Sequence, residues 1–357
     1  MARSQSNVEL TVGLDLGDRN AHVCVVDSDG KKVKEDRIAL TANALGRFFR
    51  GKGPWRVALE VGTHSPWVSE ALREYGHHVI VANARKVRLI AKSDRKSDRV
   101  DAEMLARIAR LDPQLLCPIR HRGAQARADL ALLRSRDLLV ASRTSMVSHV
   151  RSTVKSFGHR LPSCSADSFH KIPEEQLPES VRHVLFKVLE QIEVQTRAIK
   201  AMDKEIERLS RERYPETSLL RQVHGVGPVT ALCFVLTLED PRRFKKSRQV
   251  GPYLGLVPRQ RDSGRSSPQL RITKAGDIML RRLLVSCAQY ILGPFGTDSD
   301  LRRWGLKLAT VGGSNGKKRA VVAVARKLAT LLHHLWKTGE ILEPLRGQEP
   351  ATRPRTA

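Results

Sequence analysis

The sequence predicts an α/β N-terminal domain followed by a mainly α-helical remainder. Short β-rich runs come first, at residues 10–16, 21–27 and 31–40, and the turn DSDG at 27–30 joins the second run to the third. Stretches with strand and helix character then alternate as far as about residue 111. Beyond that point long helical repeats replace the strands. An α/β domain with a helical continuation is the expected fold class.

Apolar periodicity places the N-terminal elements one by one. The first three runs form an antiparallel meander. A helix is expected from Thr41, a buried strand at 56–62, a helix from Pro66 and a strand at 78–83. Helical segments follow, one of them opening at Ser97. A meander combined with crossover helices predicts a mixed sheet.

The middle of the chain predicts two long helices. Residues 125–158 are helical and basic, and the second helix carries two rows at heptad spacing. The first row is Leu185, Ile192, Ile199 and Ile206, and the second, three residues later, is Val188, Gln195, Met202 and Leu209. The helices can pair as an antiparallel hairpin or enter an intermolecular coiled coil, and four matched heptads favour the coiled coil.

A third region begins near residue 216. It contains Gly225-Val226-Gly227-Pro228 between two apolar helical stretches, which resembles a helix-hairpin-helix turn. Glycines allow backbone amides to approach phosphates, but a simple helix connection explains the turn equally well. The predicted parts are an α/β domain at 1–120, a helical coiled-coil region at 121–214, a C-terminal domain at 215–345 and a disordered tail at 346–357.

The composition indicates a polyanionic partner. Lys and Arg number 63 against 37 Asp and Glu, so the formal net charge is +26. Aromatic residues make up only 4%, which disfavours base stacking as the main mode of recognition. No apolar run approaches the ~20 residues that span a bilayer, and the five cysteines include no C-x-x-C pair. A cytoplasmic protein with no membrane partner, no disulfide framework and no zinc site is expected.

Four acidic residues stand out by their positions. Asp15 and Glu60 lie within apolar strands, where a carboxylate is costly unless it is paired or bound to metal. Asp98 and Asp101 are three residues apart at a helix start, so they share one face with Cβ atoms about 5 to 6 Å apart. Helix capping explains the second pair as well, and that interpretation stays open.

The simplest way to accommodate these four carboxylates is to gather them at one end of the sheet around divalent cations. Mg²⁺ prefers hard oxygen ligands at about 2.0 to 2.1 Å, and Mn²⁺ is the alternative ion. Two ions about 3.5 to 4 Å apart would stabilise both the attacking and the leaving oxygen in phosphoryl transfer. Asp18 and Asp94 are interpreted instead as turn and capping residues.

Basic residues and the glycine turn are the expected contacts to nucleic acid. Cations beside the acids would bring a phosphate backbone to a site that otherwise repels it. The candidates are Lys92, Arg95, Lys96, Arg99, Gly225, Gly227, Lys245, Lys246, Arg265, Arg271, Lys274, Lys317, Lys318, Arg326 and Lys327. For the last four, simple solvation of an amphipathic helix is the competing explanation. His333 and His334 have no partners at ligand spacing and are expected to be structural.

These motifs together resemble a known family. The meander with Asp15, the strand with Glu60 and K-S-D-x-x-D-A at a helix start resemble the RuvC-like (ribonuclease H fold) domain of DEDD-type insertion-sequence transposases, the Piv/MooV-like recombinases guided by a bridge RNA. HGVGPVTA and FKKSRQVGPYLGLVPRQRDSGRSSPQLRITKAGDIMLRRLL resemble that family's C-terminal transposase domain. The resemblance covers residues 10–340.

The resemblance implies a function. The family's metal-binding acids correspond to Asp15, Glu60, Asp98 and Asp101, and its nucleophilic serine corresponds to Ser263, just before a glycine. It implies a transposase that joins double-stranded donor and target DNA through a covalent phosphoserine, guided by a bridge-type RNA and completed within a homo-oligomer, dimer or tetramer, at the bacterial nucleoid. Without the resemblance, Ser263 is an ordinary loop serine.

Two other functions remain open. A RuvC-like nuclease would hydrolyse DNA junctions with an activated water molecule, and Ser263 would then be irrelevant. A non-catalytic basic scaffold would need none of the acids. Both catalytic functions require Asp15 and Glu60, whereas only the recombinase requires the serine.

Overall fold

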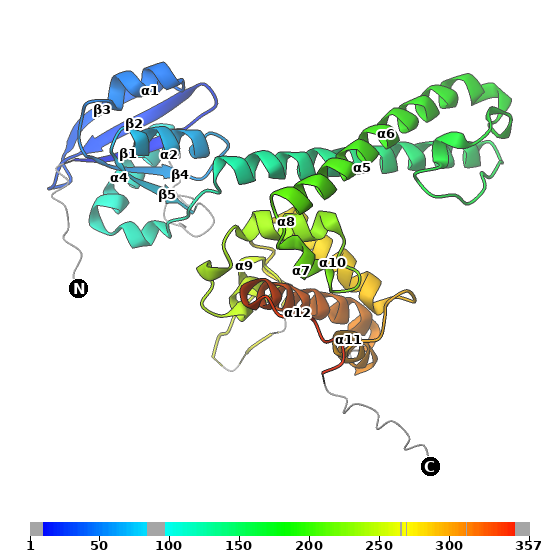
Figure 1. Cartoon of the computed structure of the whole chain (residues 1–357). Helices are drawn as coiled ribbons and strands as arrows, with labels where there is room; N and C mark the ends of the chain where they lie inside the picture. Colours follow the sequence, from blue (N-terminus) through cyan, green and yellow to red (C-terminus); the bar gives the residue numbers. More distant parts are fainter. Residues whose placement is uncertain (1–9, 84–96, 265, 269, 312, 347–357) are drawn as a thin grey trace, which may run out of the picture. The chain divides into compact units, whose positions relative to one another are not determined.

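The computed structural model describes residues 10–83, 97–264, 266–268, 270–311 and 313–346. The chain divides into two compact units, residues 1–121 and 122–357. The first unit is α/β and the second is helical (Figure 1). Within the described residues, no helix combines the length and the apolar character needed to cross a bilayer. The division of the chain into four parts stays a prediction.

The first unit contains a five-stranded mixed sheet with the order β3-β2-β1-β4-β5. The first three strands pair antiparallel, whereas β4 is parallel to both β1 and β5. The predicted meander, the two later strands and the mixed sheet are therefore confirmed. The strands are β1 (Thr11–Leu16), β2 (Asn20–Val26), β3 (Lys32–Ala39), β4 (Arg56–Glu60) and β5 (His78–Ala82).

Helices cover both faces of this sheet. The helices α1 (Ala42–Phe49) and α2 (Ser65–Glu74) contribute to a core with Val12, Leu14 and their neighbours on one face. The helix α4 (Asp98–Leu111) packs on the other face (Figure 1). Thr41 and Ser97 cap α1 and α4 with their side-chain oxygens, as their positions in the sequence predict.

The second unit begins with the long helices α5 (Ala124–Ser156) and α6 (Arg182–Glu212), which pack against each other (Figure 1). Two cross-helix contacts, Arg136 with Asp203 and Arg143 with Thr196, show that the helices run antiparallel, because the residue numbers rise on α5 as they fall on α6. The predicted first heptad row is buried. Of the predicted second row, Leu209 is buried, but Val188, Gln195 and Met202 are only half-buried, and Leu189 and Thr196 are the buried residues beside the first two of these positions. The inner positions therefore alternate at spacings of four and three residues.

The rest of the second unit packs around α8 (Pro228–Leu238), which is buried from Thr230 to its last residue. A helix that is apolar all round must be enclosed by its neighbours. These neighbours are α5, α6, α7 (Thr217–Arg221) and α10 (Ile278–Leu292), and Phe234 of α8 also meets Trp336 of α12 (Gly316–Thr338). The helices α9 (Val250–Tyr253) and α11 (Asp300–Val311) pack against α12. Short 3₁₀ helices complete the chain at Pro113–Leu116, Phe169–Lys171, Glu174–Gln176, Glu179–Val181, Pro241–Arg243, Ser247–Gln249 and Gly313–Asn315.

Candidate active site

The four predicted acids meet at one end of the sheet, on the face covered by α4. The strands β1 and β4 are parallel and pair Leu14 with Leu59, so Asp15 and Glu60 come next on neighbouring strands. Both lie two residues beyond positions that pack toward α4, and successive side chains of a strand alternate between faces. Asp98 and Asp101 lie in the first turn of that helix. These two acids therefore lie where they can stabilise the start of the helix and also where they approach the other two acids.

Burial and the neighbouring acids change the ionisation of Asp15. Burial of this half-buried side chain, followed by the negative charges of Asp98, Asp101 and Glu60, raises the pKa of Asp15 from 3.8 to about 6. Nearby His22 acts in the opposite direction. The four carboxylates are thus close enough to interact electrostatically, and the site carries excess negative charge.

His22 is a site residue that the sequence analysis missed. It lies directly opposite Asp15 in the β1–β2 register, and its Nε2 atom is 3.7 Å from Oδ2 of Asp98. It shares the α4 face of β2 with Cys24 and Val26. The two-residue alternation in AHVCVV, combined with the register of the hairpin, is the pattern that could have located it.

Gly13 allows α4 to approach the sheet. A Cβ atom at this position would lie 1.9 Å from the carbonyl oxygen of Ala102 and 2.6 Å from the amide nitrogen of Ala106. Both contacts are backbone atoms of α4, so no side chain can rotate away to make room. The absence of a side chain at Gly13 therefore sets how closely Asp98 and Asp101 approach Asp15 and Glu60.

We expect Gly13→Ala to displace α4, destabilise the first unit by about 1–3 kcal/mol and weaken catalysis. The matched control is Gly62→Ala, because a Cβ atom there meets nothing within 4 Å. Thermal unfolding and recombination assays measure the two effects. A Gly13→Ala protein that melts and recombines like Gly62→Ala would contradict this view of the helix contact.

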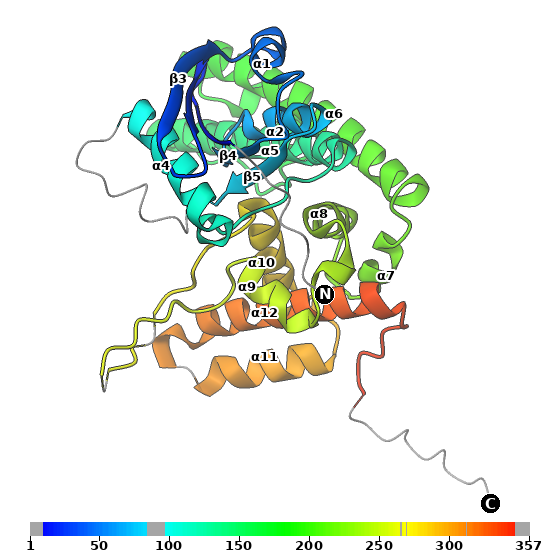
Figure 2. The ribbon, with the colours of Figure 1, turned by 90° about the vertical axis from the view of Figure 1, so that its left-hand side faces the viewer.

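Ser263 lies in the second unit, at the tip of an extended ribbon. The predicted polar loop at 257–277 folds back on itself: Arg259 N–H donates to the Arg271 carbonyl at 3.0 Å, and Ser263 and Ser266 exchange backbone hydrogen bonds of 3.0 and 2.9 Å. Gly264 adopts a φ of 55° in this tight turn. Figure 2 shows the ribbon between α9 and α10 projecting from the surrounding helices.

The side chain of Ser263 is exposed. Among the described residues, no group forms a hydrogen bond with its hydroxyl. An unactivated serine is a weak nucleophile, so this hydroxyl requires an activating group for catalysis. The described residues of the ribbon present the serine to solvent.

Comparison with known proteins identifies the family. A family model described as Transposase matches residues 12–158, and one described as Transposase IS116/IS110/IS902 family matches residues 217–295. The "Probable family 20 transposase" of Pseudomonas aeruginosa is 30% identical over 302 residues, which are 82% of this chain and 87% of that protein. The chain belongs to the IS110 family of DEDD transposases.

Other relatives agree over most of the length. The "Transposase for insertion sequence element IS1328" of Yersinia enterocolitica is 29% identical over 79% of this chain and 84% of its own length. The "Transposase for insertion sequence element IS1111A" of Coxiella burnetii is 26% identical over 92% of this chain and 90% of its own length. This DEDD transposase is a DNA-recombining enzyme, and its mixed sheet fits the RuvC-like nuclease fold of the family.

Membership of the family implies dependence on a divalent metal. In the part of the chain that the structure describes, no three His, Cys, Asp or Glu side chains are arranged to hold an ion. The donor set nevertheless fits one, because the four side chains are hard carboxylates, and both causes of the raised pKa of Asp15, its burial and the charges of the other acids, would be offset by a cation. Charges interact over longer distances than those between a metal ion and its ligands. The four acids can therefore affect the pKa of Asp15 without lying at ligand distance from a common point.

The predicted nucleic-acid contacts of this transposase are dispersed. Lys92, Arg95, Lys96 and Arg265 lie outside the described residues. Arg99 forms an ion pair with Glu35, so part of its charge is neutralised within the first unit. Arg271 and Lys274 are exposed on the ribbon that carries Ser263.

The glycine turn and the last helix differ in exposure. Gly225 has a φ of 95° and packs against Tyr290, so this turn forms a tight connection between helices. Lys317, Lys318 and Arg326 are exposed on α12. Lys327, on the same helix, lies over the ring of Trp304, 4.4 Å from its centroid. Contact of any of these residues with nucleic acid stays a prediction.

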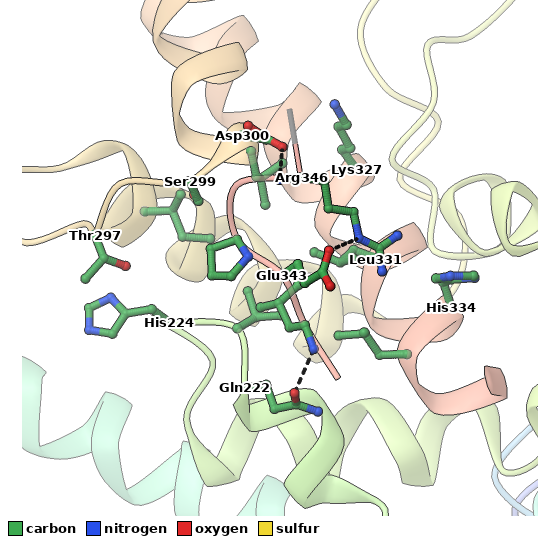
Figure 3. A pocket seen from close by; sticks show the side chains of 16 residues that line it. Gln222, His224, Thr297, Ser299, Asp300, Lys327, Leu331, His334, Glu343 and Arg346 are labelled. Carbon is green, nitrogen blue, oxygen red and sulfur yellow. Dashed lines mark hydrogen bonds and ion pairs between the residues drawn. The ribbon is translucent and has the colours of Figure 1, made fainter. Parts of the chain in front are cut away.

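A cavity of about 310 Å³ lies within the second unit, and none of the predicted catalytic residues lines it. Residues 342–346 form one wall (Figure 3). Two hydrogen bonds hold this segment: the Leu342 backbone amide donates to the Gln222 side-chain oxygen, and the Arg346 backbone amide donates to the Asp300 carboxylate. Because the chain itself covers this cavity, it is part of the packing of the C-terminal segment.

Proposed function

We propose that this transposase moves an insertion sequence by cutting and rejoining donor and target DNA through a covalent phosphoserine at Ser263. The observation that carries the proposal is the approach of Glu60, Asp98 and Asp101 to Asp15, whose pKa is raised by burial and by the charges of these three acids. Names of two relatives refer to insertion sequence elements. The four carboxylates would hold the divalent ions, with Mg²⁺ as the preferred ion and two ions per site as the expected number.

In this proposal Ser263 Oγ attacks the scissile phosphorus. A bond forms between Oγ and phosphorus, the bond to the 3′ oxygen breaks, the serine proton is released and the 3′ oxygen leaves as a hydroxyl. Bound divalent ions would supply Lewis acid stabilisation of the charge that develops on the phosphate. Arg271 and Lys274, on the same ribbon, would attract the negatively charged backbone.

Rejoining reverses this step with a different strand. A 3′-hydroxyl attacks the phosphoserine, releases Ser263 and takes over the phosphodiester bond. The serine ester conserves the energy of the broken bond, so no nucleoside triphosphate is needed. DNA exchange by this route leaves the enzyme unchanged.

We further propose a guide RNA of the bridge type and a homo-oligomer, dimer or tetramer, with composite active sites. A net charge of +26 and an aromatic content of 4% fit a protein that holds nucleic-acid backbones by charge and leaves sequence recognition to base pairing. The acids and Ser263 belong to different compact units, so a site completed between protomers suits this arrangement.

Trapping the covalent intermediate tests the proposed mechanism. The protein is incubated with donor DNA and Mg²⁺, denatured and digested, and the peptides are analysed by mass spectrometry. We expect DNA attached through a 5′ phosphate to the peptide that contains Ser263, and no adduct when EDTA removes the metal. Cleavage to free ends without any adduct would instead support a nuclease that uses water.

Sequencing of RNA that copurifies with the protein tests the proposed guide. We expect one abundant RNA with segments complementary to the recombining DNA, and its removal should stop recombination while leaving the fold intact. Full recombination by RNA-free protein would rule out the guide and leave the serine mechanism standing.

A further inference from the structure

A second cationic feature lies apart from the ribbon of Ser263. We call residues 241–248, PRRFKKSR, the cationic loop. Its cations Arg242, Arg243, Lys245, Lys246 and Arg248 all have exposed side chains. The neighbouring acid, Asp240, pairs with Arg242 at 3.3 Å. The loop therefore presents a dense, mostly uncompensated positive charge.

One buried histidine fastens both ends of this loop. His333 of α12 has no exposed surface; its Nδ1 atom is 2.9 Å from Ser247 Oγ and its Nε2 atom is 2.9 Å from the Pro241 carbonyl oxygen. A carbonyl only accepts, so Nε2 carries the proton and Nδ1 accepts from the serine hydroxyl. Burial lowers the pKa of His333, which agrees with a neutral ring in this role.

The middle of the loop is held as firmly as its ends. Phe244 is buried, and its ring packs edge-on against Tyr253 and His333 at centroid distances of 5.3 and 5.5 Å. Lys337 Nζ donates to the carbonyl oxygens of Lys245 at 3.1 Å and Phe244 at 3.4 Å. Arg243 donates to the Leu238 carbonyl at 2.8 Å and lies over the rings of Phe244 and Tyr253. The other cationic side chains of the loop stay exposed while its backbone and aromatic ring are fixed on the inner side.

Helix α12 adds a further cation beside the loop. The exposed Arg326 runs along Gly251, in the helix that follows the loop, where a Cβ atom would lie 3.1 Å from Arg326 Cγ. A surface whose backbone is already ordered loses less conformational entropy on binding than a flexible loop does. Such preorganisation suits a repeating polyanion more than a small ligand.

We propose that the cationic loop and Arg326 form a preformed binding surface for the phosphodiester backbone of a nucleic acid, and that His333 is its positioning residue. The inference deepens the proposed function, since it assigns the protein's polyanion contact to a defined surface. His333 acts through Pro241 and Ser247 and does not touch the nucleic acid.

The test compares three variants of the full-length protein. Lys245→Ala/Lys246→Ala removes two charges, His333→Leu removes both hydrogen bonds and His333→Gln restores a donor and an acceptor. His334→Gln is the matched control, because His334 is the next residue on α12 and its side chain pairs with Glu340 instead of the loop. Dissociation constants for a 30-bp DNA duplex and for an RNA hairpin are measured over a range of salt concentrations.

Each phosphate contact contributes about 0.9 to the slope of log affinity against log salt for duplex DNA. The double variant removes two cations, so we expect the magnitude of that slope to fall by nearly twice this amount. His333→Leu should weaken binding by about 10-fold, lower the slope and speed amide hydrogen exchange in residues 241–248, whereas His333→Gln recovers most of the affinity. A loss confined to DNA or to RNA identifies which backbone the surface holds.

Two results would overturn the inference. One is a double variant that binds both nucleic acids with unchanged affinity and slope; if it also recombines DNA normally, the proposed function stands without this surface. The other is a His333→Leu protein that melts like the wild type and binds with unchanged slope. If His333→Leu fails to fold, Ser247→Ala removes one of the same hydrogen bonds and decides the question by the same measurements.

Discussion

Ser263→Ala is expected to abolish both the covalent protein–DNA adduct and recombination, while DNA binding and stability stay unchanged. The serine hydroxyl is exposed at the tip of its ribbon, so its removal leaves no cavity and no buried polar group unsatisfied. Losing the proposed nucleophile should lower the rate by on the order of 10³-fold or more. Gel assays of strand exchange and thermal unfolding measure the two halves of this prediction.

Neighbouring serines provide the controls. Ser266→Ala and Ser267→Ala alter exposed side chains of the same ribbon, and both variants should keep full activity. Adduct formation that survives in Ser263→Ala but disappears in Ser267→Ala would move the nucleophile along the ribbon. Strand cleavage without an adduct in all three variants would exclude a serine nucleophile from this loop.

Much of the first unit could be predicted because local chemistry and tertiary packing agree there. Thr41 and Ser97 are good helix caps in sequence and serve as caps in the fold. Asp15 and Glu60 stood out because a carboxylate is costly within an apolar strand, and their convergence follows from the parallel pairing of β1 with β4. The acidic site was therefore predictable from residue type and strand order.

Other features depend on contacts that sequence patterns do not determine. His22 joins the acids only through the register of a hairpin, which a single-residue slip would reverse. In α6 the adjacent apolar residues Val188 and Leu189 could each belong to the buried row of the helix. Packing against α5 buries Leu189 and leaves Val188 only partly buried. His333 was expected to be structural from its lack of ligand-spaced partners, but its hydrogen bonds reach more than 80 residues back along the chain.

Asp15→Asn is expected to stabilise the metal-free protein while it destroys catalysis. The folded protein holds the Asp15 proton more tightly than the unfolded chain does, because the pKa is raised from 3.8 to about 6. The stability that this group contributes is therefore present at low pH and is lost as the pH rises through about 6. At pH 8 the charged side chain lies among three other acids, and the amide removes that repulsion.

The gain in stability should be on the order of 1 kcal/mol at pH 8, after allowance for the solvent screening of a half-buried side chain. It should shrink toward zero as the pH falls from about 6 to about 4. Thermal unfolding in EDTA over this pH range measures it. Asp18→Asn is the matched control, because that side chain is 93% exposed at the same end of the sheet and should give no such gain.

Added metal should reverse the order of stability of the wild type and Asp15→Asn. A divalent ion that binds only the folded state stabilises it in proportion to the logarithm of its concentration, so Mg²⁺ or Mn²⁺ should raise the melting temperature of the wild type and of Asp18→Asn. Asp15→Asn lacks a proposed ligand and should show little rise, together with a loss of recombination on the order of 10³-fold. An Asp15→Asn protein that is less stable than the wild type in EDTA, or equally stabilised by metal, would mean that the four carboxylates do not form a metal site. The repulsion seen without metal and the affinity for metal have one physical origin, since the same uncompensated charge that weakens the fold attracts the ion.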